Sequence, residues 1–211
     1  MVNKLYPDNQ SLKKAHLDYP DIMKEGWKPW VVHSNIGIKL KLVSSLIHDN
    51  SVLLDVGCNS GEMGLMFKEV NNCNVYGVDI SSSLVKLANG KGIKAVVGDA
   101  ERLPYKDCSF DCVYLGEMLE HSYNPGGILS DIRRVLKPGG QLVGNTINEI
   151  WMSRNIPVYR WEDERLHSRQ YDTGIMRNLL KKFFDNIKVK NLLTDKSSQA
   201  WIIFSGRKSN A

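Results

Sequence analysis

The residues best suited to chemistry begin in a glycine-rich stretch, residues 52–64, with the sequence VLLDVGCNSGEMG. An apolar run that contains the acid Asp55 ends in a turn with Gly57 and Gly61. Glycine lets the backbone turn tightly and approach a ligand without a Cβ in the way, and Gly64 lets the following helix pack closely on a sheet. This pattern predicts a strand, a turn and a helix in that order. Such a turn is suited to bind a small charged cofactor.

A second acid stands at the end of the next apolar run. Residues 74–78 lead into Asp79, and an acid at the tip of the second strand of a βαβ unit is suited to hold a ribose diol. The dinucleotide-binding pattern is G-x-G-x-x-G, whereas three residues separate Gly57 from Gly61. This spacing argues against a nicotinamide dinucleotide as the ligand.

The remaining motifs follow in an order that resembles a known family. A third apolar run, residues 93–97, leads into Gly-Asp-Ala at 98–100, and ERLPYKDCSFDCVYLGEMLEH and DIRRVLKPGGQLVGNT come after it. Residues 52–146 thereby resemble the class I S-adenosylmethionine-dependent methyltransferases. The resemblance implies an α/β fold with a doubly wound, Rossmann-like, seven-stranded sheet, mostly parallel with one antiparallel edge strand. It also implies S-adenosylmethionine as the cofactor.

The same resemblance implies which residues bind that cofactor. The glycine loop would lie along its methionine part, and Asp79 would bind the ribose hydroxyls. The turn with Asp99 would bind the adenine, and the end of the fourth strand would border the methionine. The implied cofactor-binding residues are Asp55, Gly57, Cys58, Gly61, Asp79, Ile80, Asp99, Ala100, Leu115 and Gly116. Asp is also common in loops and at helix N-caps, so a structural role for Asp79 and Asp99 stays open.

The segment EMLEH that continues the fourth strand is the best source of polar groups near the transferred methyl. Because that methyl is already activated, the protein's main tasks are to align the acceptor, exclude water and take a proton. We therefore predict Glu117, Glu120 and His121 as catalytic residues, with His121 as a candidate general base. A histidine near a strand end often only satisfies backbone groups, which is the structural alternative.

The E-x-x-E-H spelling, with P-x-x-x-L and KPGG after it, is similar to the O-methyltransferases of ubiquinone biosynthesis. That local similarity implies a phenolic acceptor and a divalent cation, which two carboxylates and an imidazole would suit. Leu-Glu-His is also widespread among other class I enzymes for small molecules. We therefore predict no metal ligand and keep the cation as the less favoured alternative. The N-terminal GWKPWVVHSN lacks the proline and arginine that follow the histidine in the quinone enzymes, which weakens the case for a quinone acceptor.

Two variable segments flank this core. Residues 1–50 are predicted to be an N-terminal helical extension or lid, in which Trp27, Trp30 and His33 either cap the ligands or pack on the sheet. Residues 51–211 are predicted to be the methyltransferase domain. Its acceptor-side insertion lies at about residues 148–173, where the alternation of strand and helix lapses.

Side chains outside the motifs have simpler interpretations. For His167, inside the insertion, a loop hydrogen bond is the favoured role. Residues 175–184 carry apolar side chains at helical spacing, which favours core packing, with peripheral membrane contact as the alternative.

Composition fits one globular domain. The chain has 211 residues, of which 42% are hydrophobic and 24% charged, and its net charge of +5 does not single out a partner. It shows no apolar run of membrane-spanning length and no signal peptide, so we expect a cytoplasmic protein. Four cysteines without a C-x-x-C pair favour reduced thiols over a zinc knuckle or disulfides.

These features predict methyl transfer from S-adenosylmethionine to a small-molecule acceptor, with oxygen as the predicted atom. A nucleic-acid or protein methyltransferase is the alternative, but the [DN]-P-P-[YF] motif typical of enzymes acting on planar amines is absent, and no dense basic stripe appears. A module that binds the cofactor without catalysis is a third interpretation. The acceptor and the oligomeric state are not encoded in any motif.

Overall fold

The computed structural model describes residue 10 and residues 34–155, 167–193 and 200–210. Trp27, Trp30 and His33 lie outside the described residues. The strands are β1 (Val52–Val56), β2 (Asn74–Asp79), β3 (Lys94–Val97), β4 (Phe110–Gly116), β5 (Leu136–Ile147), β6 (Asp185–Leu193) and β7 (Ala200–Arg207). The helices are α2 (Ser34–Ser44), α3 (Glu62–Val70), α4 (Ser82–Gly90), α5 (Pro125–Val135), α6 (Glu149–Asn155), α7 (Thr173–Leu180) and a 3₁₀ turn, η1 (Leu119–His121).

The strands form a seven-stranded sheet in the order β3-β2-β1-β4-β5-β7-β6. The pairs from β3 to β5 are parallel, and β7 runs antiparallel to both of its neighbours, β5 and β6. The predicted α/β fold with a mostly parallel, doubly wound sheet is confirmed. None of the helices in the described part of the chain is long and apolar enough to cross a membrane.

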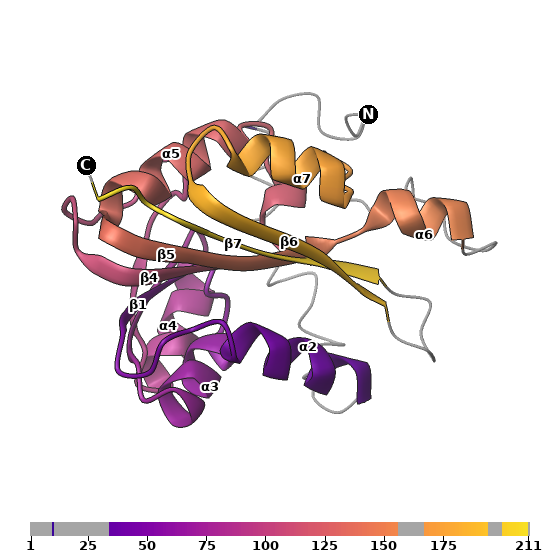
Figure 1. Cartoon of the computed structure of the whole chain (residues 1–211). Coiled ribbons are helices and arrows are strands. Elements are labelled where there is room, and N and C mark those ends of the chain that lie inside the picture. The colour runs from indigo at the N-terminus through magenta and orange to yellow at the C-terminus, as the bar shows by residue number, and fades with distance from the viewer. Residues whose placement is uncertain (1–9, 11–33, 156–166, 194–199, 211) are drawn as a thin grey trace.

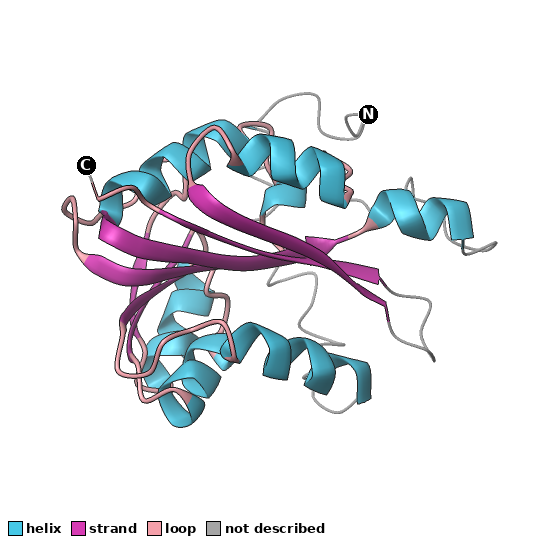
Figure 2. Ribbon diagram, viewed as in Figure 1, coloured by secondary structure: helices cyan, strands magenta, loops and turns pink. Residues whose placement is uncertain are grey.

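Helices cover both faces of the sheet (Figures 1 and 2). Helices α5 and α7 lie on one face, and α2, α3 and α4 lie on the other. Alternating side chains of β1 enter two cores, because successive residues of a strand point to opposite faces. Leu54 and Val56 pack in the core under α5 and α7, and Leu53 packs in the core that contains Phe67 of α3.

The basic amphipathic stretch near the C-terminal end packs into the protein. Met176, Leu180 and Phe184 are at most 4% exposed and belong to the core under α5 and α7, whereas Ile175 is exposed. The predicted core packing of this stretch is confirmed. The four cysteines are free thiols, as expected.

Close packing of α3 on the sheet depends on Gly64. A Cβ at this position would lie 3.1 Å from Ile93 Cδ1 and 3.2 Å from Val75 Cγ1. This helix begins directly after the glycine loop, so its distance from β2 decides how that loop sits at the sheet edge. The expected packing role of Gly64 is confirmed.

Two features differ from the sequence pattern, in which Pro138, Gly139 and Gly140 are expected to separate a helix from the fifth strand. Helix α5 ends at Val135, before Pro138, and β5 already begins at Leu136. The strand pairing between β4 and β5 shifts register at this point, between the pairs that begin at Phe110 and Cys112, which accommodates the proline and the two glycines within β5. The supposed lapse after residue 147 contains the short helix α6.

Candidate active site

The loops with the predicted functional residues follow β1, β2, β3 and β4 at one edge of the sheet. In the sheet, β1 lies between β2 and β4. The strand order therefore reverses between β1 and β4. Ligands of open α/β sheets bind outside the carboxyl ends of the strands at such a reversal. The predicted residues therefore lie where the topology favours a ligand.

The glycine loop turns sharply over the end of β2. Gly57 N–H and Cys58 N–H both donate to Val78 O, at 2.8 and 3.0 Å. Gly57 and Gly61 have φ angles of +74° and +88°, and a Cβ at Gly61 would lie 3.0 Å from Ala88 Cα. Both positions thus need glycine for their conformation, and Gly61 also needs it for space.

Asp79 connects this loop to the next one. Its carboxylate accepts from Asn59 N–H and from Ser81 N–H, each at 2.9 Å. Burial raises the pKa of Asp79, while these backbone hydrogen bonds lower it. Asp79 therefore has a structural role, as the alternative interpretation allowed, and each carboxylate oxygen retains a lone pair for a second donor.

Asp55 is a buried acid beneath the glycine loop, with 2% of its surface exposed. Its Oδ2 has no hydrogen-bond partner among the described residues. Burial, followed by the charges of Asp79 and Glu62, raises the pKa of Asp55 to about 7. A buried carboxyl group with an unsatisfied oxygen is suited to pair with a positively charged ligand group.

Several predicted cofactor residues are buried or lie at the ends of strands. Cys58 is 3% exposed, and its Sγ packs against Gly77, where a Cβ would lie 2.8 Å from it. Leu115 is 0% exposed and belongs to the core. Ile80 directly follows β2, and Gly116 ends β4.

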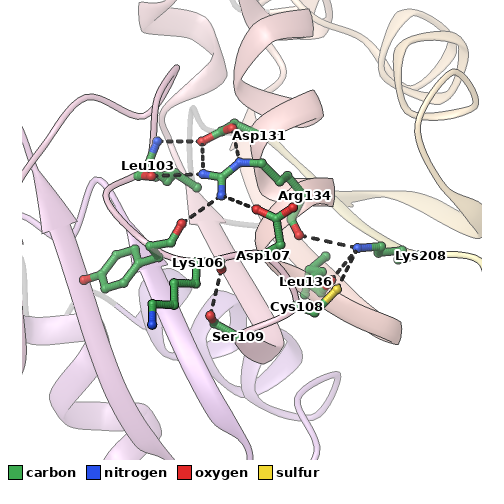
Figure 3. Close-up of polar contacts among 10 residues, drawn as sticks. Leu103, Lys106, Asp107, Cys108, Ser109, Asp131, Arg134, Leu136 and Lys208 are labelled. Atoms are coloured by element: carbon green, nitrogen blue, oxygen red, sulfur yellow. Dashed lines mark hydrogen bonds and ion pairs between the residues drawn. The ribbon is translucent and has the colours of Figure 1, made fainter.

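The loop after β3 is held by an arginine network (Figure 3). Arg134 of α5 donates to both oxygens of Asp131, to Leu103 O, and to Asp107 Oδ1 at 2.8 Å. Asp131 in turn accepts from Leu103 N–H at 2.6 Å. This network fixes the segment that follows the predicted adenine-binding turn.

In that turn, Ala100 is buried, with 6% of its surface exposed. Asp99 Oδ1 accepts from Glu101 N–H at 2.9 Å. The Asp99 carboxylate thus caps its own turn, which is the structural role left open for it.

The three predicted catalytic residues do not form one group. The Glu117 side chain forms an ion pair with Lys39 of α2 and accepts from Asn145 Nδ2 at 3.2 Å. Its φ angle is +47°, a strained backbone conformation for a residue other than glycine. Glu117 therefore connects the end of β4 to the N-terminal helix.

Glu120 and His121 instead meet a residue from the insertion. The ring centroids of His121 and His167 lie 4.6 Å apart, in an edge-to-face arrangement. Glu120 is 1% exposed, and Glu120, His121 and His167 each offer one nitrogen or oxygen atom within 4.8 Å of the others. We call these three residues the polar cluster.

His167 is held in place by a second buried acid. Its Nδ1 lies 2.5 Å from Glu149 Oε1, and Glu149 is fully buried. The segment after it is bound to the η1 turn, since Ser168 N–H donates to Glu120 O at 2.7 Å and Arg169 Nε donates to Ser122 O at 3.1 Å. His167 does form the expected hydrogen bond, but its position in the polar cluster was not predicted, nor was the part played by Glu149.

Burial raises the pKa of Glu120 to about 7, the charge of His167 lowers it, and the charge of Glu117 raises it. A carboxyl group with a pKa near neutrality, next to two imidazoles, can take or give a proton. Such a cluster can also ligate a metal ion.

Comparison with known proteins agrees with this layout. A family model described as a methyltransferase domain matches residues 54–144. The 27-O-demethylrifamycin SV methyltransferase of Amycolatopsis mediterranei is 39% identical over 98 residues, which cover 43% of this chain and 36% of that protein. An uncharacterized protein of Methanocaldococcus jannaschii is 31% identical over 173 residues, which cover 81% of this chain and 58% of that protein. The chain thus spans between about a third and three-fifths of the length of these relatives.

A solved structure of an S-adenosylmethionine-dependent methyltransferase from Thermotoga maritima superposes with a TM-score of 0.70. It has 18% sequence identity, and the match covers 97% of this chain and 100% of that one. At 18% identity, this similarity shows that the two chains share a fold. With the domain match, the sheet order and the glycine loop, it leads to one conclusion: residues 54–144 are a methyltransferase domain, in a chain with the fold of the S-adenosylmethionine-dependent methyltransferases.

Proposed function

We propose that this chain transfers the methyl group of S-adenosylmethionine to a hydroxyl oxygen of a small-molecule acceptor. The observation that carries this proposal is the proximity of the glycine loop to the segment that leads to the polar cluster. A Cβ at Gly57 would lie 3.5 Å from Met118 Sδ, and η1 follows Met118 directly. Proton-accepting groups therefore come next to the loop proposed to hold the methyl donor.

On the cofactor side, we assign the ribose hydroxyls to Asp79 and the methionine ammonium group to the region of Asp55. The spare lone pairs of Asp79 suit two hydroxyl donors. The buried Asp55, with one unsatisfied oxygen, suits a cation. The backbone at Gly57, Gly61 and Gly116 would line the methionine, and the turn at Asp99 and Ala100, with Ile80, would border the adenine.

On the acceptor side, a hydroxyl must lose its proton when its oxygen is methylated. We assign that task to the polar cluster, in which Glu120 and His121 follow shortly after the end of β4, with His121 as the proton acceptor. A correctly placed proton acceptor contributes about 10² to 10⁴-fold to such a reaction. The relative named for methylation of a rifamycin oxygen supports the choice of oxygen and of a small molecule.

Two measurements test the proposal. Calorimetry should show that the chain binds S-adenosylmethionine and S-adenosylhomocysteine, each of which raises its melting temperature. A screen with cofactor labelled in the methyl group, against phenols, sugars, quinone precursors, carboxylic acids and amines, should then transfer label to a hydroxyl. Absence of cofactor binding would refute the cofactor assignment, and label found only on nitrogen would refute the acceptor assignment.

A further inference from the structure

We propose that Glu120, His121 and His167 bind one transition-metal dication, with Zn²⁺ as the best-fitting ion. Their ligand atoms lie within 4.8 Å of one another. Around a tetrahedral zinc ion, ligand atoms at ordinary bond lengths are separated by about 3.4 Å. Side-chain adjustments of an ångström or so at each residue would bring all three onto one ion.

The backbone that carries the three side chains is already held together. Glu120 and His121 are consecutive residues of η1. His167 arrives from the insertion, and the next two residues fix its segment to that turn through the hydrogen bonds of Ser168 N–H to Glu120 O and Arg169 Nε to Ser122 O. Such preorganisation lowers the cost of assembling a binding site.

Glu149 orients His167 as metal-binding histidines are commonly oriented. A carboxylate can only accept, so we assign the proton to Nδ1 of His167, which donates to Glu149 Oε1. The proton-free Nε2 is then the ligand atom. Histidine ligands in metal sites almost always donate their other ring N–H to a carboxylate, carbonyl or water in this way.

Glu120 supplies an independent observation in favour of a bound cation. It is 1% exposed, and its Oε2 has no hydrogen-bond partner among the described residues. Burying a carboxyl oxygen without a partner is costly, and a bound cation would remove that cost. Glu117, by contrast, is engaged by Lys39 and Asn145 and is not part of the proposed site.

The ligand types select the ion. Two imidazoles and one carboxylate suit zinc and other first-row transition metals, whereas Mg²⁺ and Ca²⁺ prefer all-oxygen sites. Three protein ligands leave a coordination position for water or an acceptor hydroxyl, whose pKa a metal ion would lower. With the ion bound, the cluster would promote the proposed reaction by lowering this pKa and not by taking the proton on His121, and ion binding itself does not depend on that reaction.

The test measures ion binding directly. The chain, stripped with a chelator, is titrated with Co²⁺, whose visible absorption reports a site with nitrogen ligands, and with Zn²⁺ in competition with a chromophoric chelator. We expect one ion per chain and no competition from Mg²⁺. His121→Ala and His167→Ala should each weaken Zn²⁺ binding more than about 100-fold, and Glu149→Gln should weaken it about 10 to 100-fold.

Glu117→Gln and Cys108→Ser, the latter at the exposed thiol, are the matched controls and should bind Zn²⁺ like the parent. His167→Gln replaces His167→Ala if the alanine variant does not fold. Failure of the parent to take up one ion, or unchanged affinity in the folded His167 variant, would overturn the metal site. S-adenosylmethionine binding, measured on the same samples, separates this result from failure of the proposed function.

Discussion

The two halves of the carboxyl edge of the sheet are built differently. In the cofactor half, formed by the loops after β1, β2 and β3, polar contacts join residues closer in sequence: Asn59 and Asp79 are 20 positions apart, and Leu103 and Arg134 are 31 apart. In the acceptor half, Glu120 and Ser168 are 48 positions apart. The cofactor half is thus assembled by short βαβ segments, and the acceptor half by an insertion that returns to the end of β4.

The sharpest test of this division is His121→Ala. If the acceptor half carries out the chemistry alone, turnover should fall by about 10² to 10⁴-fold while affinity for S-adenosylmethionine stays unchanged. Single-turnover rates with an acceptor from the screen, together with calorimetry, measure both quantities. His48→Ala, in a histidine that contacts Arg207 outside this edge, is the control. Normal turnover in His121→Ala would remove the residue from the catalytic set.

The pH dependence of stability examines the buried acid in the cofactor half. The pKa of Asp55 is raised from its ordinary value of 3.8 to about 7 when folded, so the folded state holds this proton more tightly than the unfolded state. The free energy of unfolding should therefore fall as pH rises from about 4 to 7, by about 3 kcal/mol between pH 5 and pH 8.

Asp55→Asn should remove this part of the slope. Urea denaturation of both proteins without cofactor, at several pH values, measures the difference. Parallel pH profiles would show that Asp55 ionises in the folded protein as it does in the unfolded chain, so that burial does not raise its pKa.

Asp79→Ala addresses the cofactor half itself. Loss of charge-assisted hydrogen bonds to the ribose should weaken S-adenosylmethionine binding by about 1.5 to 3 kcal/mol, and Asp79→Asn should lose less. Asp185→Asn, at an exposed carboxylate of β6, is the control. If both Asp79 variants bind the cofactor like the parent, its hydrogen bonds to Asn59 and Ser81 are its whole role.

The smallest expected effect concerns Glu117, which lies between the halves. Its side chain is 45% exposed, and such ion pairs contribute about 1 kcal/mol or less. Glu117→Gln and Lys39→Met, alone and combined, should give a coupling energy in that range by chemical denaturation. A larger coupling energy would show that the contact of Glu117 with Lys39 of α2 contributes to folding as a buried contact does. A loss of turnover without loss of stability would show that Glu117 is a catalytic residue.

The same contrast explains what could be predicted from sequence. The sheet and the cofactor half follow from local patterns: apolar runs, acids at strand ends and glycines at Gly57 and Gly61, where the φ angles are positive. The structural roles of Asp79 and Asp99 could be foreseen as alternatives. The pairing of His121 with His167 could not, because residues 46 positions apart meet only through tertiary folding. Nothing near Glu149 marks it as a buried partner of His167.

The antiparallel strand β7 has a consequence for how the protein is made. β6 joins the sheet only through β7, which comes later in the chain. During synthesis, β6 therefore leaves the ribosome before β7, the strand with which it pairs. Until β7 emerges, the backbone N–H and C=O groups of β6 lack that pairing. Long-range pairing of this kind is slow and exposes strand edges to other chains. Pairing with β7 thus joins β6, on which α7 packs, to the rest of the sheet.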